Sequence, residues 1–412
     1  MTVKGERLSL VVHHVGGRDG GGPFTLPAAI SADSPIVYYE ADSKAGEGMK
    51  SDARPTTIIT KCLGESRGQQ LFNITTKPHA SSLRMLDLKY AEAYVSRPSE
   101  DRVFSVMFGV ARTVSIETEP LDEIIFSEGK NVAPPDILTL DTEGTEFEIL
   151  KGASRTIDQE LVCIVTEASI LPIRKGQMLL GDLLASLSEQ KFIPIRIQPH
   201  SSELSLYRFP VGLRGEGIQA ISDVVFLRDL DSAMNTWSGQ KLAVKLRKLA
   251  LAAIAYGQLE YALECLSRAR LVGLPEVDVA PRYWQFLDKL ERCSAAVPAC
   301  YPPIAGAKLA ASAALKEVRQ APEVIGRKAP SLLRTLKGAL KSFLMRNPGL
   351  FAKIVWAFTF GKQLWARASL FLTRCFASSS TVEKVLREYG FIELSKLVRS
   401  RRLEQSPWSI KV

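Results

Sequence analysis

The chain has 412 residues, 46% of them hydrophobic, and a formal net charge of +9. This length is too great for one ordinary domain, and the composition is normal for a folded globular protein, so we expect two or more folded domains. The six cysteines form no Cys-x-x-Cys pair and show no zinc-ligand spacing, which favours buried, reduced thiols in a cytosolic protein. No apolar run is long enough to span a membrane, and the apolar N-terminal stretch is too short for a signal peptide.

Two strands and a glycine-rich turn open the chain. Leu8–Val15 predicts a strand that leads into the turn GGRDGGG at residues 16–22, where a ligand can approach the backbone closely. Ile36–Tyr39 predicts a second strand that ends in Glu40. The alternatives are a merely flexible turn and an exposed acid at the end of a strand.

Further strands follow before the most informative stretch. Thr57–Cys62 predicts a third strand, and Val110–Ile116 predicts an edge strand. Between them lie Ser81 and Ser82, whose hydroxyls can contact a ligand or only cap a turn.

The most informative stretch is PDILTLDTEGTEFEILKGA, residues 135–153. Its apolar start predicts a buried parallel strand, and the apolar spacing after Glu146 predicts a helix. Asp141 and Glu143 fall in the acidic turn between them. At the carboxyl edge of an open sheet, two carboxylates can orient hydroxyl or amino groups, accept a proton or hold a metal. The alternative is that Asp141 caps the helix and the other acids are solvated in its first turn.

Further predicted strands follow, up to about residue 229. Leu161–Thr166 predicts a buried strand that ends at Glu167, which would lie beside Asp141 if the two strands are neighbours. Phe192–Ile197 and Asp223–Leu227 predict a closing strand pair.

Residues 135–153 resemble the signature of the FkbM family of S-adenosylmethionine-dependent methyltransferases. That signature is a strand, then Asp-x-x-Gly-x-Glu, then a helix that ends in Leu-x-Gly-Ala; the matching positions are Asp141, Glu143, Gly144, Glu146, Leu150 and Gly152. The resemblance covers roughly residues 8–229. It implies an α/β fold with a seven-stranded, Rossmann-like class I methyltransferase sheet and helices on both faces, followed by an α-helical C-terminal region.

The resemblance also implies roles for individual residues. Glu40 would bind the ribose hydroxyls of S-adenosylmethionine, and Asp141 would also face this cofactor. Asp141, Glu143 and Glu167 are the expected catalytic residues, and no metal is required. The glycine-rich turn would wrap the cofactor through Gly16, Gly17, Asp19 and Gly20. The family usually has an acid at the end of the first strand, where this chain has His13 and His14.

The second half of the chain is different in character. Lys241–Ala269 predicts a helical hairpin of tetratricopeptide type. Between Glu323 and Glu383 there is no acidic residue, and basic residues alternate with Trp and Phe. This pattern predicts peripheral contact with an anionic membrane surface through residues 324–381, or else a packing domain with a solvated basic face. No nucleic-acid recognition motif accompanies the charge, so nucleic acid is not an expected partner.

The sequence therefore predicts a methyltransferase domain at 1–232, a tetratricopeptide-like helical region at 233–295 and a basic helical region at 296–412. The expected reaction is O-methylation of a hydroxyl on a small-molecule, sugar or glycan-like substrate, as in polysaccharide biosynthesis. The expected location is the cytoplasm, at the inner face of the membrane if the basic region binds lipid. The alternative is a catalytically degenerate binding module whose helical half docks a partner or a membrane. The oligomeric state is not predicted.

Overall fold

The computed structural model describes residues 9–16, 26, 28–31, 33–41, 55–91, 93–96, 102–103, 108–127, 132–205, 218–272, 282–295, 382–392 and 395–396. Gly17, Asp19, Gly20 and the basic stretch 324–381 lie outside these residues. The chain divides into two compact units, one of residues 1–291 with 389–394, the other of 292–388 with 395–412.

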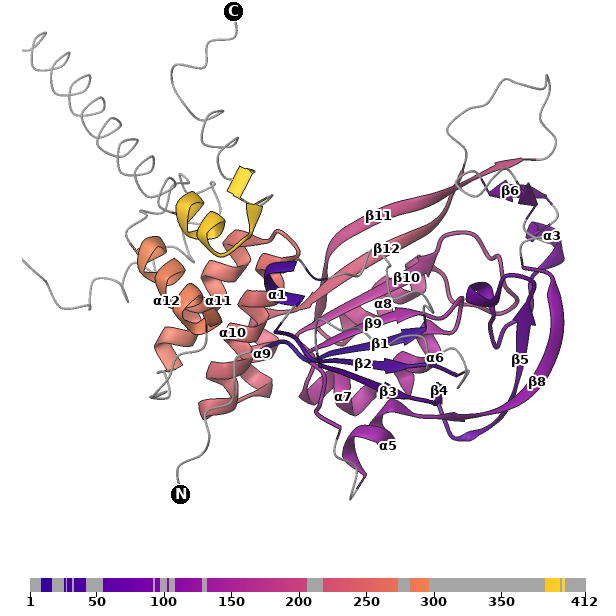
Figure 1. The fold of residues 1–412 in the computed structure, drawn as a ribbon, viewed down its shortest axis with the longest axis horizontal. Helices are drawn as coiled ribbons and strands as arrows, with labels where there is room; N and C mark the ends of the chain where they lie inside the picture. Colours follow the sequence, from indigo (N-terminus) through magenta and orange to yellow (C-terminus); the bar gives the residue numbers. More distant parts are fainter. Residues whose placement is uncertain are drawn as a thin grey trace, which may run out of the picture. The chain divides into compact units, whose positions relative to one another are not determined.

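The first unit is built on a sheet with the strand order β3-β2-β1-β9-β10-β12-β11-β6-β7 (Figure 1). The strands are β1 Val12–Gly16, β2 Ile36–Tyr39, β3 Thr56–Ile59, β6 Tyr94–Ser96, β7 Arg102–Val103, β9 Ile137–Asp141, β10 Cys163–Ser169, β11 Phe192–Ser205 and β12 Ile218–Arg228. The strands from β3 to β11 in this order form the expected seven-stranded sheet, in which β12 runs antiparallel to both neighbours. β6 and β7 extend the sheet by pairing with the far end of β11.

Helices flank this sheet, as the sequence predicts. They are α1 Ala28–Ser31, α3 Leu88–Ala91, α5 Leu121–Phe126, α6 Glu146–Lys151, α7 Ser154–Gln159 and α8 Leu180–Glu189. From β1 the chain moves outward to β2, whereas from β9 it moves in the opposite direction to β10. Right-handed crossovers therefore put α1 and the α6–α7 pair on opposite faces. β2 and β9, which read IVYY and ILTLD, are mostly apolar because both of their faces are covered. Their core includes Leu138, Leu140, Ile149, Leu187 and Phe226, all almost fully buried.

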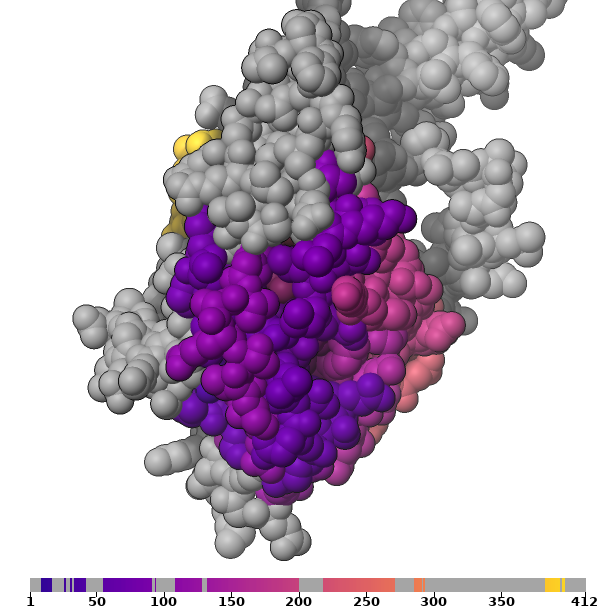
Figure 2. Space-filling model, turned by 90° about the vertical axis from the view of Figure 1, so that its right-hand side faces the viewer, coloured from indigo at the N-terminus to yellow at the C-terminus, as the bar shows by residue number. Residues whose placement is uncertain are grey.

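A second sheet of three strands lies beside the main one, in the order β4-β8-β5. Its strands are β4 Cys62–Leu63, β5 Gly68–Thr75 and β8 Val110–Glu119. The predicted edge strand at 110–116 pairs only with β5, while Thr118 and Glu119 at the end of β8 also pair with β4. A short 3-10 helix, η1 Pro78–Ala80, follows β5. In Figure 2, purple atoms from this part of the chain lie at the centre of the face, with pink atoms of later segments beside them.

Further helices follow the sheet: α9 Leu230–Thr236, α10 Gly239–Ala255, α11 Leu259–Val272 and α12 Arg282–Ala295, the last of which extends beyond residue 291 into the second unit. α10 and α11 occupy the two arms of the predicted helical hairpin. Within the described residues, no helix has both the length and the apolar character needed to cross a membrane.

A buried ion-pair network joins α10 to the main sheet. Asp136, just before β9, is fully buried, and its carboxylate accepts hydrogen bonds from Lys245 (3.0 Å), Lys248 (2.8 Å) and the Val11 amide (2.9 Å). Burial alone would raise the pKa of the Asp136 carboxyl, but the two lysines and these hydrogen bonds together hold it below its ordinary value. Lys245 also donates to the Glu160 carbonyl (2.5 Å) and lies 3.2 Å from its carboxylate. Residues beyond 232 therefore supply the positive charges that pair with the buried Asp136 carboxylate.

Candidate active site

The point where the sheet changes winding direction lies between β1 and β9. These parallel neighbours pair Gly16 with Asp141 at their carboxyl ends. Open α/β sheets bind ligands at such a point. Gly16 has φ +86°, and a Cβ there would lie 1.8 Å from the Asp141 carbonyl oxygen. Only glycine fits at this position, so the first strand ends without a side chain.

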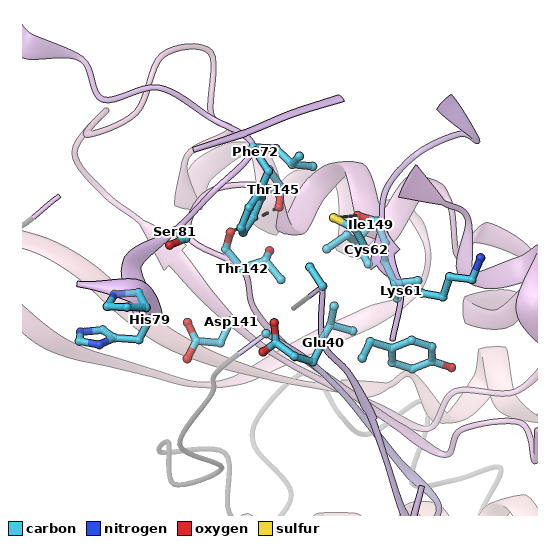
Figure 3. Close-up of a pocket in the computed structure, with 17 residues that line it drawn as sticks. Glu40, Lys61, Cys62, Phe72, His79, Ser81, Asp141, Thr142, Thr145 and Ile149 are labelled. Atoms are coloured by element: carbon cyan, nitrogen blue, oxygen red, sulfur yellow. Dashed lines mark hydrogen bonds between the residues drawn. The ribbon is translucent and has the colours of Figure 1, made fainter. Parts of the chain in front are cut away.

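A cavity opens at this point, with an empty volume of ≈590 Å³ that includes its open mouth. The cavity is lined by residues from several elements, among them Gly16, Glu40, Lys61, His79, Ser81 and Asp141. In Figure 3, the Glu40 and Asp141 carboxylates lie in the middle, between His79 at one end and Lys61 at the other. The structure therefore brings together four residues that the sequence singles out, although they lie far apart in the chain: Gly16, Glu40, Ser81 and Asp141.

Glu40 follows β2 directly and lies on the wall of this cavity. Its amide donates to the Ile59 carbonyl (3.1 Å) on β3, which fixes the backbone, and its side chain is only 7% exposed. A carboxylate held in this way can accept hydrogen bonds from two adjacent hydroxyls.

The acidic turn is closed by Glu146, the first residue of α6. The Glu146 carboxylate accepts hydrogen bonds from the Thr142 amide (2.9 Å), the Thr142 hydroxyl (3.0 Å) and the Gly144 amide (3.0 Å). These bonds hold Glu143 at φ +58°, a backbone region that non-glycine residues seldom adopt. The residue that caps α6 is Thr145, so the alternative that Asp141 caps this helix is wrong.

Asp141 and Glu167 lie on neighbouring strands, as expected, because β9 pairs with β10 up to Leu140 and Thr166. Burial raises the pKa of Asp141 well above its ordinary value, and the nearby carboxylates of Glu167 and Glu143 raise it further. Burial likewise raises the pKa of Glu167, which also faces Asp223 on β12. This end of the cavity therefore gathers carboxyl groups in a poorly solvated place, where a cationic ligand would favour their ionised forms. No group of metal-ligating side chains occurs among the described residues.

The two histidines of β1 are buried and bound elsewhere. His13 is hydrogen-bonded through Nε2 to the Ala133 carbonyl (3.0 Å) and through Nδ1 to the Tyr39 hydroxyl (3.0 Å). Burial lowers its pKa to about 4, so it is neutral at ordinary pH. His14 Nδ1 bonds the Thr139 hydroxyl (2.6 Å). Neither histidine lines the cavity, and so neither replaces the acid that the family usually has there.

Sequence reasoning missed several residues that line the cavity, among them Lys61 and His79. The only signal for His79 was a lone histidine just before Ser81 and Ser82. The two serines differ in role. Ser81 lines the cavity, whereas the Ser82 hydroxyl donates to the Glu143 carbonyl (2.8 Å) and accepts from the Arg84 amide (2.9 Å). Ser82 is thus a structural link between this segment and the acidic turn.

Residues 56–194 match the family model described as the methyltransferase FkbM domain. This match confirms the resemblance over that range, which contains Asp141, Glu143 and Glu167, and it supports a methyltransferase. No curated protein matches the chain. One solved structure, a methyltransferase FkbM from Methylobacillus flagellatus KT, matches with 14% identity and a TM-score of 0.25. That match covers 53% of this chain and 44% of the other, so this chain spans less than half the length of that protein.

Proposed function

We propose that this protein is an S-adenosylmethionine-dependent methyltransferase that methylates a hydroxyl group of a sugar or glycan-like substrate. The observation that supports this most is the convergence of Gly16, Glu40 and Asp141 on one cavity at the switch point of the sheet. Each of these residues comes from the end of a different parallel strand. Gly16 and Glu40 precede the range matched by the family model, so their placement is independent support.

The residues of the cavity fit the cofactor chemically. Glu40 would accept hydrogen bonds from the two ribose hydroxyls, and Gly16 leaves the backbone open to close approach. Asp141, with Glu143 and Glu167 nearby, would favour the positively charged sulfonium and ammonium groups of its methionine part. When bound, S-adenosylmethionine supplies an activated methyl group on a sulfonium centre.

The contribution of the protein to catalysis would be mainly positioning. A direct displacement requires the acceptor oxygen to be aligned with the methyl group, and a rigid site can provide this. A base near the acceptor would take up the hydroxyl proton. We assign this role to Asp141 or Glu143, and Glu167 supports it by keeping the pKa of Asp141 high.

The test is turnover with the full chain. Incubation with S-adenosylmethionine and a panel of free sugars and oligosaccharides should produce S-adenosylhomocysteine and a methyl ether with at least one acceptor. Cofactor binding without turnover on any acceptor would favour the binding-module alternative. A failure to bind the cofactor would exclude the methyltransferase function.

We also propose that the protein contacts the inner surface of a membrane through residues 324–381, which lie outside the described residues. The support is the acid-free sequence with its interleaved basic and aromatic residues. The full chain should sediment with anionic vesicles, and deletion of 324–381 should abolish this while cofactor binding is retained. Binding should weaken as salt rises, because charge attraction is screened over about 8–10 Å at physiological salt. Equal sedimentation of both proteins would contradict the proposal.

A further inference from the structure

Two arginines form reciprocal bridges between the segments that enclose the acidic end of the cavity. Arg174, after β10, donates from Nη2 to the Glu143 carboxylate (2.6 Å) and to the Ala80 carbonyl (3.1 Å) at the end of η1. Arg84, after η1, donates to the Lys175 carbonyl (3.0 Å) and pairs with the Glu148 carboxylate on α6. Each arginine thus donates to a backbone carbonyl in the segment that carries the other arginine. Each also pairs with a glutamate of residues 135–153.

The backbone holds both arginines in place. Leu86 and Arg174 form an antiparallel bridge, flanked by hydrogen bonds from Asp87 N to the Ile173 carbonyl (2.8 Å) and from Lys175 N to the Met85 carbonyl (2.9 Å). The stem of Arg174 passes over Gly144, where an added Cβ would lie 3.0 Å from Arg174 Cδ and where φ is +102°. The glycine of the signature therefore serves both the turn and the passage of this arginine.

The two arginines differ in the charges that they face. Arg174 is only 4% exposed and lies against the carboxylate cluster. The cluster is contributed by β9, the acidic turn, α6, β10 and β12 through Asp141, Glu143, Glu146, Glu167 and Asp223. Arg174 opposes the effect of these carboxylates on Glu167. Arg84 instead pairs with Glu148, and neither residue is among the largest charge effects on Asp141 or Glu167. His79 on η1 also lines the cavity beside Asp141.

Building on the proposed function, we propose that Arg174 is a positioning residue for the cofactor. Its guanidinium fixes the Glu143 carboxylate against η1 and places a positive charge beside the cluster, which favours the charged form of Glu167 and so favours a cationic cofactor. Arg84 provides the same mechanical bridge without this electrostatic role. Arg174 bonds the Glu143 carboxylate and its charge acts on Glu167, so it would influence the cofactor through these two residues.

The experiment measures S-adenosylmethionine affinity by calorimetry from about pH 5 to about pH 8 in the wild type, Arg174→Gln and Arg84→Gln. Affinity should fall as pH falls, because the carboxylates must be ionised to bind a cation. Loss of a cation within a few ångströms shifts a carboxyl pKa by about one unit or more. Arg174→Gln should therefore move the midpoint of the pH dependence upward by about one unit, and Arg84→Gln should leave it in place. Arg174→Lys, which keeps the charge, should restore most of the wild-type midpoint.

Thermal unfolding controls for a purely structural role. Each glutamine variant loses one bridge between the two segments, so both variants should be destabilised to a similar extent, and only the pH midpoint should differ between them. Equal pH midpoints in the two variants would overturn the proposal. If Arg174→Gln does not fold, Glu143→Gln provides the second test, since removal of a like charge should move the midpoint downward; an unchanged midpoint would again refute the role. A wild type that binds no cofactor at any pH would refute the proposed function instead.

Discussion

Replacing Lys245 with methionine should destabilise the protein strongly, although this residue lies outside the methyltransferase domain predicted from the sequence. Methionine keeps most of the apolar stem and removes the ammonium group. Asp136 would lose one of its two cationic partners while remaining fully buried, and Glu160 would lose a partner too. Breaking a buried pair on one side costs about 3–5 kcal/mol, because the remaining charge is left in a poorly solvated place. We expect a loss of about 3 kcal/mol, since Lys248 still pairs with Asp136.

Lys241→Met is the matched control. Lys241 lies on the same helix and pairs with the same Glu160 carboxylate (2.8 Å), but its side chain is 49% exposed. Exposed pairs contribute about 0–1 kcal/mol. Urea unfolding at neutral pH should show a large fall in midpoint for Lys245→Met and a small one for Lys241→Met, with unchanged slopes. Equal losses in the two variants would refute the argument that α10 balances the charge of Asp136.

The pH dependence of this difference has a definite sign. The pKa of Asp136 is lowered in the folded protein, so its contribution to stability is present above its unfolded pKa, about 3.9. That contribution is lost as pH falls through the lowered folded pKa. The gap between wild type and Lys245→Met should therefore be full at neutral pH and should close in strong acid, as followed by urea unfolding at a series of pH values.

Three further experiments test the cavity. Gly16→Ala should abolish cofactor binding measured by calorimetry, because its Cβ would overlap the Asp141 carbonyl, whereas Gly68→Ala, with no atom near its Cβ, should bind normally. Asp141→Asn should lower the methyl-transfer rate by about two orders of magnitude, the range for a lost general base, and unchanged turnover would remove Asp141 from that role. Cofactor binding should release protons at a pH where Asp141 is partly protonated, because a bound cation lowers the raised pKa of Asp141; calorimetry in buffers of different ionisation enthalpy and at a series of pH values measures this, and identical heats in all buffers at every pH would contradict it.

The sequence was most informative where local pattern and function coincide. Residues 135–153 contain an apolar strand, an acidic turn and a helix with one apolar face, which form β9 and α6 in the structure. The spacing of the apolar residues and the acidic turn were enough to place Asp141 at the edge of the sheet where ligands bind. Glu40 was found in the same way, as an acid directly after a short apolar strand.

Long-range pairings were the part that local pattern could not predict. Arg174 meets Glu143 and Ala80, which are 31 and 94 residues away in the chain. Asp136 meets Lys245 over 109 residues. In each case a single charged residue gives no local sign of its partner. Glu146 was identified as a position of the signature, but its role in closing the turn was not predicted. That role depends on its contacts with the Thr142 and Gly144 amides, which the sequence alone does not show.

The central claim is that the cavity between β1, β2 and β9 binds S-adenosylmethionine. Calorimetric titration of the full wild-type chain and of Glu40→Ala tests it most directly. We predict saturable binding to one site in the wild type, and an affinity in Glu40→Ala that is weaker by about 1.5–3 kcal/mol, the value of a charge-assisted hydrogen bond, with unchanged thermal unfolding. A wild type that shows no binding, or a Glu40→Ala variant that binds equally well, would contradict the account.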